Sequence, residues 1–182
     1  TLDFVASVAR VLAEHQMEGH RLTLEITEQA LVRDTDQALA TLRGLQNIGV
    51  RVAIDDFGTG YSSFAQLKTL PVDILKIDKG FVRDLGSNPD DLAIVRSIIG
   101  LAGALGMQLV AEGVETQIAA GILVEMGCTH AQGFLFSAPR PPADIERILA
   151  VGGCTTMAPA DPVEHVSPIP APLRTASGYD GP

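Results

Sequence analysis

Residues 53–78 read AIDDFGTGYSSFAQLKTLPVDILKID. This stretch starts and finishes with short apolar runs, and each run stops at charged side chains. Asp55 and Asp56 follow the first run, whereas Lys76 and Asp78 close the second. The segment between them contains glycine, serine and proline, which is typical of a loop. The stretch therefore predicts two strands of one sheet, each with charged residues at its carboxyl end.

The same alternation of short apolar runs and longer amphipathic segments extends over residues 1–150. Strands are predicted at residues 21–27, 50–55, 74–78, 108–112 and 129–134, and helices at residues 2–15, 35–47, 90–105, 116–126 and 143–150. Gly49, Gly106 and Gly127 each precede a strand, which predicts left-handed helix ends, and Pro89 suits a helix start. This order indicates an α/β fold with a parallel sheet and right-handed crossovers. An open doubly wound sheet and a closed barrel both fit it.

The composition limits the classes of function. With 182 residues and 46% apolar content, the chain has enough apolar surface for a core, which excludes a wholly disordered protein. A net charge of -9 argues against a nucleic-acid polymer or an anionic membrane surface as the main partner. Two cysteines make no disulfide framework, so we expect a cytoplasmic protein, with membrane anchoring of a longer parent protein left open.

The chain changes character after residue 150. Residues 151–182 are rich in proline, glycine and small polar residues, without a hydrophobic period. Such a segment buries too little apolar surface to repay the entropy of ordering. We therefore expect a folded domain at residues 1–150 and a disordered tail at residues 151–182. Because the first residue is Thr1 rather than methionine, we also expect the chain to be part of a longer protein.

Polar residues stand at or just after the end of every predicted strand. They are Glu25, Glu28, Asp55, Asp56, Lys76, Asp78, Glu112 and Gln132. In parallel α/β folds the carboxyl ends of the strands lie on one face, where binding and catalytic sites assemble. These side chains are therefore predicted to converge, although they are far apart in the sequence.

Converging carboxylates repel one another unless cations neutralise them. Oxygen ligands without cysteine or clustered histidine favour Mg²⁺ or Mn²⁺ over zinc. The pair Asp55 and Asp56 is suited to holding or bridging two ions, and a two-ion site suits phosphodiester hydrolysis. Lys76 would then contact a phosphate oxygen or orient the attacking water.

Simpler interpretations remain for single residues. Asp55 and Asp56 precede Phe-Gly-Thr-Gly, so they also fit plain turn chemistry, and Lys76 also fits a structural ion pair with Asp78. A Schiff-base aldolase that uses Lys76 is a further alternative. The nearby carboxylates disfavour it, because they stabilise a charged lysine rather than the free amine that this chemistry needs.

Four segments resemble EAL domains, which are bacterial phosphodiesterases that open cyclic di-GMP to the linear dinucleotide pGpG. They are LEITE (24–28), the opening stretch (53–78), LVAEGVET (109–116) and AQGFLFSAP (131–139). The resemblance extends from the first helix to about residue 150. It implies a modified TIM-type (β/α) barrel and therefore favours closure over an open sheet.

The resemblance also implies roles for individual residues. Glu25, Asp55 and Asp56 are expected metal ligands for two Mg²⁺ or Mn²⁺ ions, with Ca²⁺ expected to inhibit. Lys76 is expected beside the nucleophilic water, and Glu112 is expected to act as a metal ligand or general base. The remaining matched positions are Glu28, which tethers the DFGTG loop, and the substrate-binding or supporting residues Gln132, Glu115, Phe134 and Pro139. The loop at residues 57–63 is implied in homodimerisation.

The sequence departs from the family pattern in several places. Phe134 stands where tyrosine is common, and Ala138 stands where arginine or lysine is frequent, with Arg140 close but shifted. The Glu-Ala-Leu strand and an asparagine ligand on an earlier strand do not occur. The chain thus resembles the C-terminal portion of the domain, about five of eight strand–helix units.

Three expectations follow from that gap. An eight-unit barrel would need roughly 80 further residues on the N-terminal side. The chain alone would then expose a sheet edge and be aggregation-prone, unless other residues complete the barrel. A sensory or diguanylate cyclase domain is a candidate for the region upstream of residue 1 in the parent protein. A degenerate EAL module that binds cyclic di-GMP or a protein partner without catalysis is the alternative function.

Overall fold

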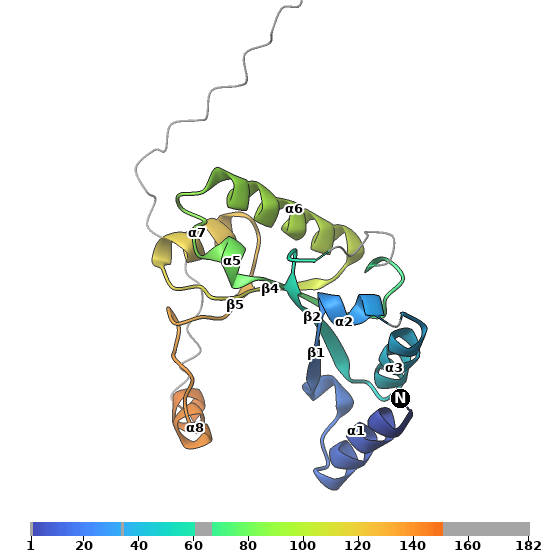
Figure 1. The fold of residues 1–182 in the computed structure, drawn as a ribbon. Helices are drawn as coiled ribbons and strands as arrows, with labels where there is room; N and C mark the ends of the chain where they lie inside the picture. The colour runs from blue at the N-terminus through green and yellow to red at the C-terminus, as the bar shows by residue number, and fades with distance from the viewer. Residues whose placement is uncertain (1, 34, 61–66, 151–182) are drawn as a thin grey trace, which may run out of the picture.

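The computed structural model describes residues 2–33, 35–60 and 67–150. Its sheet has five parallel strands in the order β1-β2-β3-β4-β5, which is also their order along the chain. The strands are β1 (Thr23–Thr27), β2 (Arg51–Phe57), β3 (Ile74–Ile77), β4 (Gln108–Ala111) and β5 (His130–Ala131). Each connection steps to the next strand in the same direction, so the sheet curves like part of a barrel wall (Figure 1). The predicted parallel α/β fold is confirmed, while the predicted tail (151–182) and part of the predicted dimer loop (61–63) lie outside the described residues.

The predicted helices are present within one or two residues of their expected bounds. The helices are α1 (Leu2–Glu14), α2 (Glu28–Arg33), α3 (Thr35–Asn47), α5 (Lys79–Val82), α6 (Pro89–Leu105), α7 (Gln117–Glu125) and α8 (Pro142–Ala150), with a 3-10 turn η1 (Gly19–Arg21). The short helices α2 and α5 were not predicted, because four to six residues are too few to show a helical period. Helix α2 begins directly after β1, and α5 begins after a single residue, Asp78, that follows β3.

Helix α6 illustrates how the sequence sets the ends of these elements. The Asn88 side chain accepts a hydrogen bond from the backbone N–H of Asp90 at 3.0 Å, and Pro89 occupies the first turn. At the other end Gly106 has a φ of 68°, the left-handed conformation predicted for it. Gly49 and Gly127 also have positive φ, as predicted.

The two faces of the sheet differ in polarity. Side chains alternate between faces along a strand, and one face carries a continuous apolar core. Its central members are Val52, Ile54, Leu75, Ile77, Leu109 and Ala111, all buried. Helices α3 and α6 pack against this side of the sheet. The other face presents the intervening residues, among them Asp55 and Lys76, and it therefore carries the polar side chains.

Strand β5 is shorter than predicted. A strand was expected at residues 129–134, but only His130 and Ala131 pair with β4. The chain then turns, and the N–H of Phe136 donates to the carbonyl of Gly133 at 3.1 Å. The backbone of Gly133 passes directly against Val114, where any Cβ would overlap backbone atoms. Backbone hydrogen bonds between the two segments nevertheless continue past residue 131, because the N–H of Gln132 donates to the carbonyl of Ala111 at 2.8 Å and the N–H of Val114 donates to the carbonyl of Gln132 at 3.0 Å.

Helix α8 stands apart from the rest of the described structure, at the end of an extended segment (Figure 1). None of its residues is buried. Among the described helices, none combines the length and the apolar content that crossing a bilayer requires.

Candidate functional site

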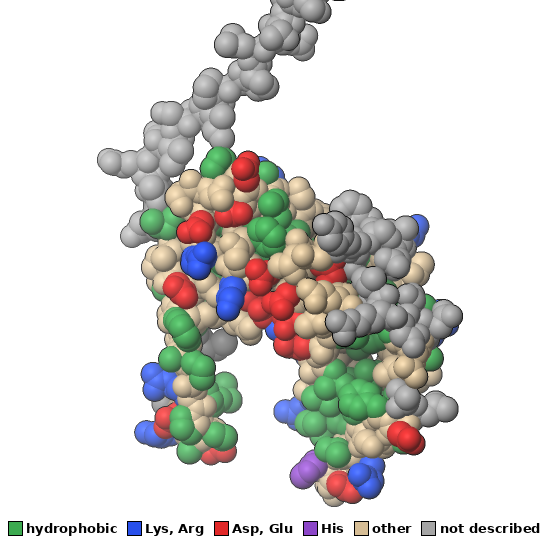
Figure 2. Space-filling view, viewed as in Figure 1, with side chains coloured by type: hydrophobic (Ala, Val, Ile, Leu, Met, Phe, Trp, Pro, Cys, Tyr) green, Lys and Arg blue, Asp and Glu red, His purple; other side chains and the backbone are tan. Residues whose placement is uncertain are grey.

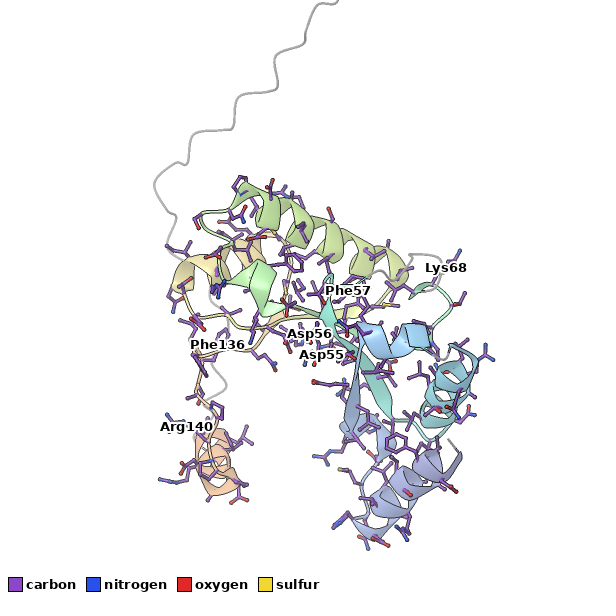
Figure 3. The ribbon with its side chains drawn as sticks, viewed as in Figure 1. Asp55, Asp56, Phe57, Lys68, Phe136 and Arg140 are labelled. Carbon is purple, nitrogen blue, oxygen red and sulfur yellow. The ribbon has the colours of Figure 1, made fainter. Side chains whose placement is uncertain are left out.

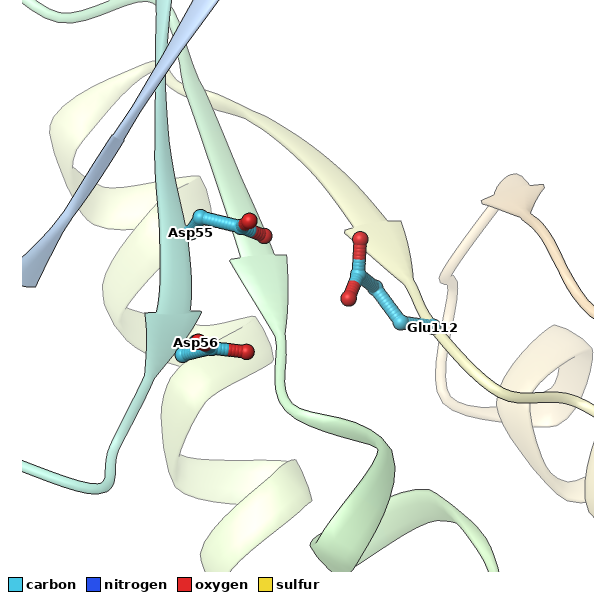
Figure 4. A group of neighbouring side chains, drawn as sticks. All are labelled: Asp55, Asp56 and Glu112. Carbon is cyan, nitrogen blue, oxygen red and sulfur yellow. The ribbon is translucent and has the colours of Figure 1, made fainter.

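The carboxyl end of β2 places two adjacent carboxylates on the same side. In a regular strand, neighbouring side chains point to opposite faces. Here the register shifts between Ile54 and Phe57, and Asp56 has a φ of 52°. Aspartate tolerates this left-handed conformation better than most residues. The resulting bulge directs Asp55 and Asp56 toward one region (Figures 3 and 4).

Glu112 completes a compact group of carboxylates. It follows β4 directly, and its side chain faces those of Asp55 and Asp56 (Figure 4). Each of the three residues offers one oxygen, and these oxygens lie within 4.8 Å of one another. In the space-filling view, acidic side chains gather near the centre of the visible face (Figure 2). A set of carboxylate oxygens with this spacing fits a hard divalent cation such as Mg²⁺ or Mn²⁺.

Lys76 links this group to Glu25. Its Nζ lies 2.7 Å from Glu25 Oε1, 2.9 Å from Asp55 Oδ1 and 2.5 Å from Glu112 Oε1. The lysine side chain is only 7% exposed. The alternative pairing of Lys76 with Asp78 is not what the structure shows, because Asp78 instead caps α5 by accepting from the N–H of Gly80 at 2.8 Å.

The site perturbs the pKa values of its groups. Burial raises the pKa of Glu112, although hydrogen bonding to the Lys76 ammonium opposes that shift. Burial also raises the pKa of Asp56, and the charge of Asp55 adds to it. Burial alone would lower the pKa of Lys76, but hydrogen bonds to its three carboxylate partners raise it above the ordinary value. Lys76 is thus held as a cation, which argues against the Schiff-base alternative.

Glu28 connects the site to the loop that follows β2. It is the first residue of α2 and is 3% exposed. Its Oε2 accepts hydrogen bonds from the backbone N–H groups of Gly58 at 3.3 Å and Gly60 at 3.1 Å. A charged acceptor on two backbone donors is a strong tie, so it joins the loop to the end of β1.

Replacing Glu28 with alanine is expected to release this loop. The N–H groups of Gly58 and Gly60 would lose their acceptor, which costs about 1–3 kcal/mol in the free energy of unfolding. Amide hydrogen exchange at both glycines should become faster. Glu125→Ala, at the exposed end of α7, is the matched control and should change neither quantity. Unchanged exchange at Gly58 and Gly60 in Glu28→Ala would show that other contacts hold the loop.

Gln132 supports the carboxylate of Glu112. Its Nε2 donates to Glu112 Oε1 at 2.7 Å. The contact follows from the register, since Ala111 pairs with Ala131 and the next residue on each strand is the polar one. The repeated pattern Ala-Glu-Gly (111–113) and Ala-Gln-Gly (131–133), at the ends of neighbouring strands, is the sequence feature that could have predicted this contact.

The other predicted site residues lie on the surface. Glu115 and Pro139 are exposed, and Phe134 is 68% exposed. Arg140, on the segment leading to α8 (Figure 3), donates from Nε to Ser137 Oγ at 3.0 Å. The substrate-contact roles of these residues remain predictions.

Sequence reasoning also missed functional features of the backbone. The left-handed conformation of Asp56 was not predicted, nor were the close approaches of Gly113 to Lys79 and of Gly133 to Val114. In each case a glycine or an aspartate lies next to a site residue. These residue types, which tolerate unusual backbone conformations, were the sequence feature that could have indicated the geometry.

The fold and the site together define a class of protein: a parallel α/β domain with a cluster of acidic side chains, suited to a divalent cation, toward the carboxyl ends of its strands. The particular family follows from the comparison with known domains. The model of the EAL domain matches residues 1–139, and the chain belongs to this family.

The similarity covers most of the chain. The bifunctional diguanylate cyclase/cyclic di-GMP phosphodiesterase MucR of Pseudomonas aeruginosa is 46% identical over 146 residues, which are 80% of this chain and 21% of MucR. The crystal structure of the EAL domain of Mycobacterium smegmatis DcpA superposes with a TM-score of 0.78 at 56% identity, covering 82% of this chain and 67% of that one.

A third neighbour carries metal and nucleotide. The manganese/cyclic di-GMP complex of Klebsiella pneumoniae BlrP1 has a TM-score of 0.71 at 36% identity, covering 75% of this chain and 35% of that one. The chain spans between 18% and 24% of the length of curated relatives that it matches.

Proposed function

We propose that the protein containing this chain hydrolyses cyclic di-GMP to linear pGpG in bacterial second-messenger signalling. The observation that carries the proposal is the convergence of Asp55, Asp56 and Glu112 beside Lys76, in a chain that belongs to the EAL family. The name of MucR and the bound nucleotide of BlrP1 support the substrate.

The donor set fits divalent metal ions. Asp55, Asp56 and Glu112 present carboxylate oxygens within reach of one cation, and Glu25 adds a fourth carboxylate through its shared contact with Lys76. We propose that these residues hold two Mg²⁺ or Mn²⁺ ions, and that Ca²⁺ inhibits. When bound, such ions supply Lewis-acid stabilisation of phosphate charge and lower the pKa of a water.

The residues of the chain prepare the site for phosphodiester cleavage. The Lys76 ammonium places a fixed positive charge where negative charge develops on phosphate oxygens. As the alternative to holding a metal ion, Glu112 would act as the general base that accepts a proton from water. Gln132 fixes the orientation of the Glu112 carboxylate, and Glu28 holds the loop beyond Asp56.

Other features of the proposal concern substrate and assembly. Phe134, Pro139 and Glu115 would line the nucleotide pocket, and the loop at residues 57–63 would contribute to a homodimer. Residues 1–150 would form part of the EAL domain, with residues 151–182 as a separate tail. The assignments within residues 1–150 rest on the family resemblance, and the separate tail rests on the composition of residues 151–182.

The test is direct hydrolysis by the complete protein. Purified protein is incubated with cyclic di-GMP and Mg²⁺, Mn²⁺ or Ca²⁺, and the nucleotides are separated by chromatography. We expect pGpG with Mg²⁺ or Mn²⁺ and little or none with Ca²⁺. Nucleotide binding in Ca²⁺ without product in any metal would instead establish the non-catalytic binding module. The absence of both nucleotide binding and product would overturn the proposed function.

A further inference from the structure

We propose that Lys76 is a built-in counter-cation that holds the metal-site carboxylates together in the absence of an ion and competes with the ion for them. This inference rests on the proposed function, since it assumes that the carboxylates bind a divalent cation. It concerns how that site is regulated rather than which reaction it performs.

The contacts of Lys76 carry the first step. One ammonium group lies within 3 Å of oxygens from Glu25, Asp55 and Glu112, which lie on or directly after three different strands. Carboxylates that converge in this way repel one another. The lysine therefore occupies the place of a cation among them, and it provides the neutralising charge when no metal is bound.

The second step is that lysine and metal share the same ligands. Asp55 and Glu112 belong both to the contacts of Lys76 and to the group of three oxygens suited to an ion. Two cations on the same carboxylates repel each other. By linkage, the lysine charge lowers metal affinity by the same factor by which the metal weakens the lysine contacts.

The third step is that Lys76 cannot leave the site easily. Its side chain is 7% exposed, and it lies between Leu75 and Ile77, which are fully buried in a central strand of the sheet. A surface lysine would swing into water when an ion arrives. This lysine stays near the ion, so the competition is not relieved by a simple rotation.

The test compares Mn²⁺ binding by the full chain and by Lys76→Met. Methionine keeps an unbranched apolar side chain of similar length and removes the charge. We expect the variant to bind Mn²⁺ about tenfold more tightly in calorimetric titration. In EDTA, we also expect Lys76→Met to have a lower melting temperature than the unaltered chain. On adding Mn²⁺, the melting temperature of the variant should rise by more than that of the unaltered chain. Lys68→Met, which removes an exposed lysine on the segment before β3 (Figure 3), should bind Mn²⁺ like the unaltered chain.

The outcomes separate this inference from the proposed function. If the unaltered chain binds Mn²⁺ and Lys76→Met binds it equally or more weakly, the competition is overturned while the metal site stands. If neither protein binds Mn²⁺, the metal site of the proposed function fails, and the inference fails with it. Tighter binding by the variant supports the inference whatever the substrate is.

If Lys76→Met does not fold, a second measurement tests whether Lys76 competes with the metal ion. The chain has three lysines, Lys68, Lys76 and Lys79. Replacing Lys68 and Lys79 with arginine leaves Lys76 as the sole lysine, so its ¹⁵N-labelled Nζ gives one side-chain signal. We expect that signal to shift and its protons to exchange faster with water as Mg²⁺ is added. A signal unchanged by saturating Mg²⁺ would overturn the competition.

Discussion

Asp55→Asn is expected to lower the turnover of cyclic di-GMP by the complete protein about a thousandfold, which corresponds to about 4 kcal/mol of transition-state stabilisation. Asp55 takes part in both sets of contacts in the site. It belongs to the group of three carboxylates suited to a cation, and it also contacts the Lys76 ammonium at 2.9 Å. Asparagine keeps the shape of the side chain but removes the negative charge, so the loss would be electrostatic.

The measurement is kcat/KM for pGpG formation at saturating Mg²⁺ or Mn²⁺. Asp90→Asn is the matched control, because Asp90 is an exposed aspartate in the first turn of α6. That variant should retain the unaltered rate, and both variants should have unaltered circular dichroism. Retention of more than about a tenth of the rate by Asp55→Asn would exclude Asp55 as a metal ligand for this reaction.

The convergence of the site could be predicted from the sequence because it follows from topology. Polar residues close each strand, and parallel strands bring their carboxyl ends to one edge. The prediction placed Asp55 and Glu112 together although 57 positions of sequence separate them, and the structure brings their carboxylates face to face (Figure 4).

The details of the site could not be predicted, because they depend on register and on local backbone geometry. A regular β2 would have turned Asp55 and Asp56 to opposite faces, and only the bulge with its left-handed Asp56 brings them together. Similarly, the partners of Lys76 depend on how far β3 is displaced along β2 and β4. The sequence neighbour Asp78 was a plausible partner, but it lies at the start of α5 and caps that helix instead.

The end of β5 is a second feature that the sequence did not predict correctly. A strand was predicted to residue 134, but β5 ends at Ala131, and Gly133 then passes close to the backbone of Val114. The contact joins the two segments that carry Glu112 and Gln132. The hydrogen bond between Gln132 and Glu112 therefore depends on the neighbouring approach of Gly133 to Val114, which leaves no room for a side chain at residue 133.

Gly133→Ala is accordingly expected to destabilise the fold strongly. The new Cβ would overlap the backbone nitrogen and oxygen of Val114, and backbone cannot rotate aside as a side chain does. The Val114 N–H donates to the carbonyl of Gln132 at 3.0 Å, so separating the segments would break that bond as well. We expect a loss of about 3 kcal/mol in the free energy of unfolding, measured by urea denaturation.

Gly103→Ala provides the matched control for that substitution. Gly103 lies within α6, where a Cβ would meet no atom within 4 Å, so alanine should be neutral or stabilise the chain by about 0.5–1 kcal/mol. If Gly133→Ala were as stable as Gly103→Ala, the segments of Glu112 and Gln132 would have to separate without cost. Their hydrogen bond would then be an incidental contact, and the orientation of Glu112 would need another cause. If only Gly133→Ala is destabilised, the glycine after the predicted strand is what allows the two polar ends to meet.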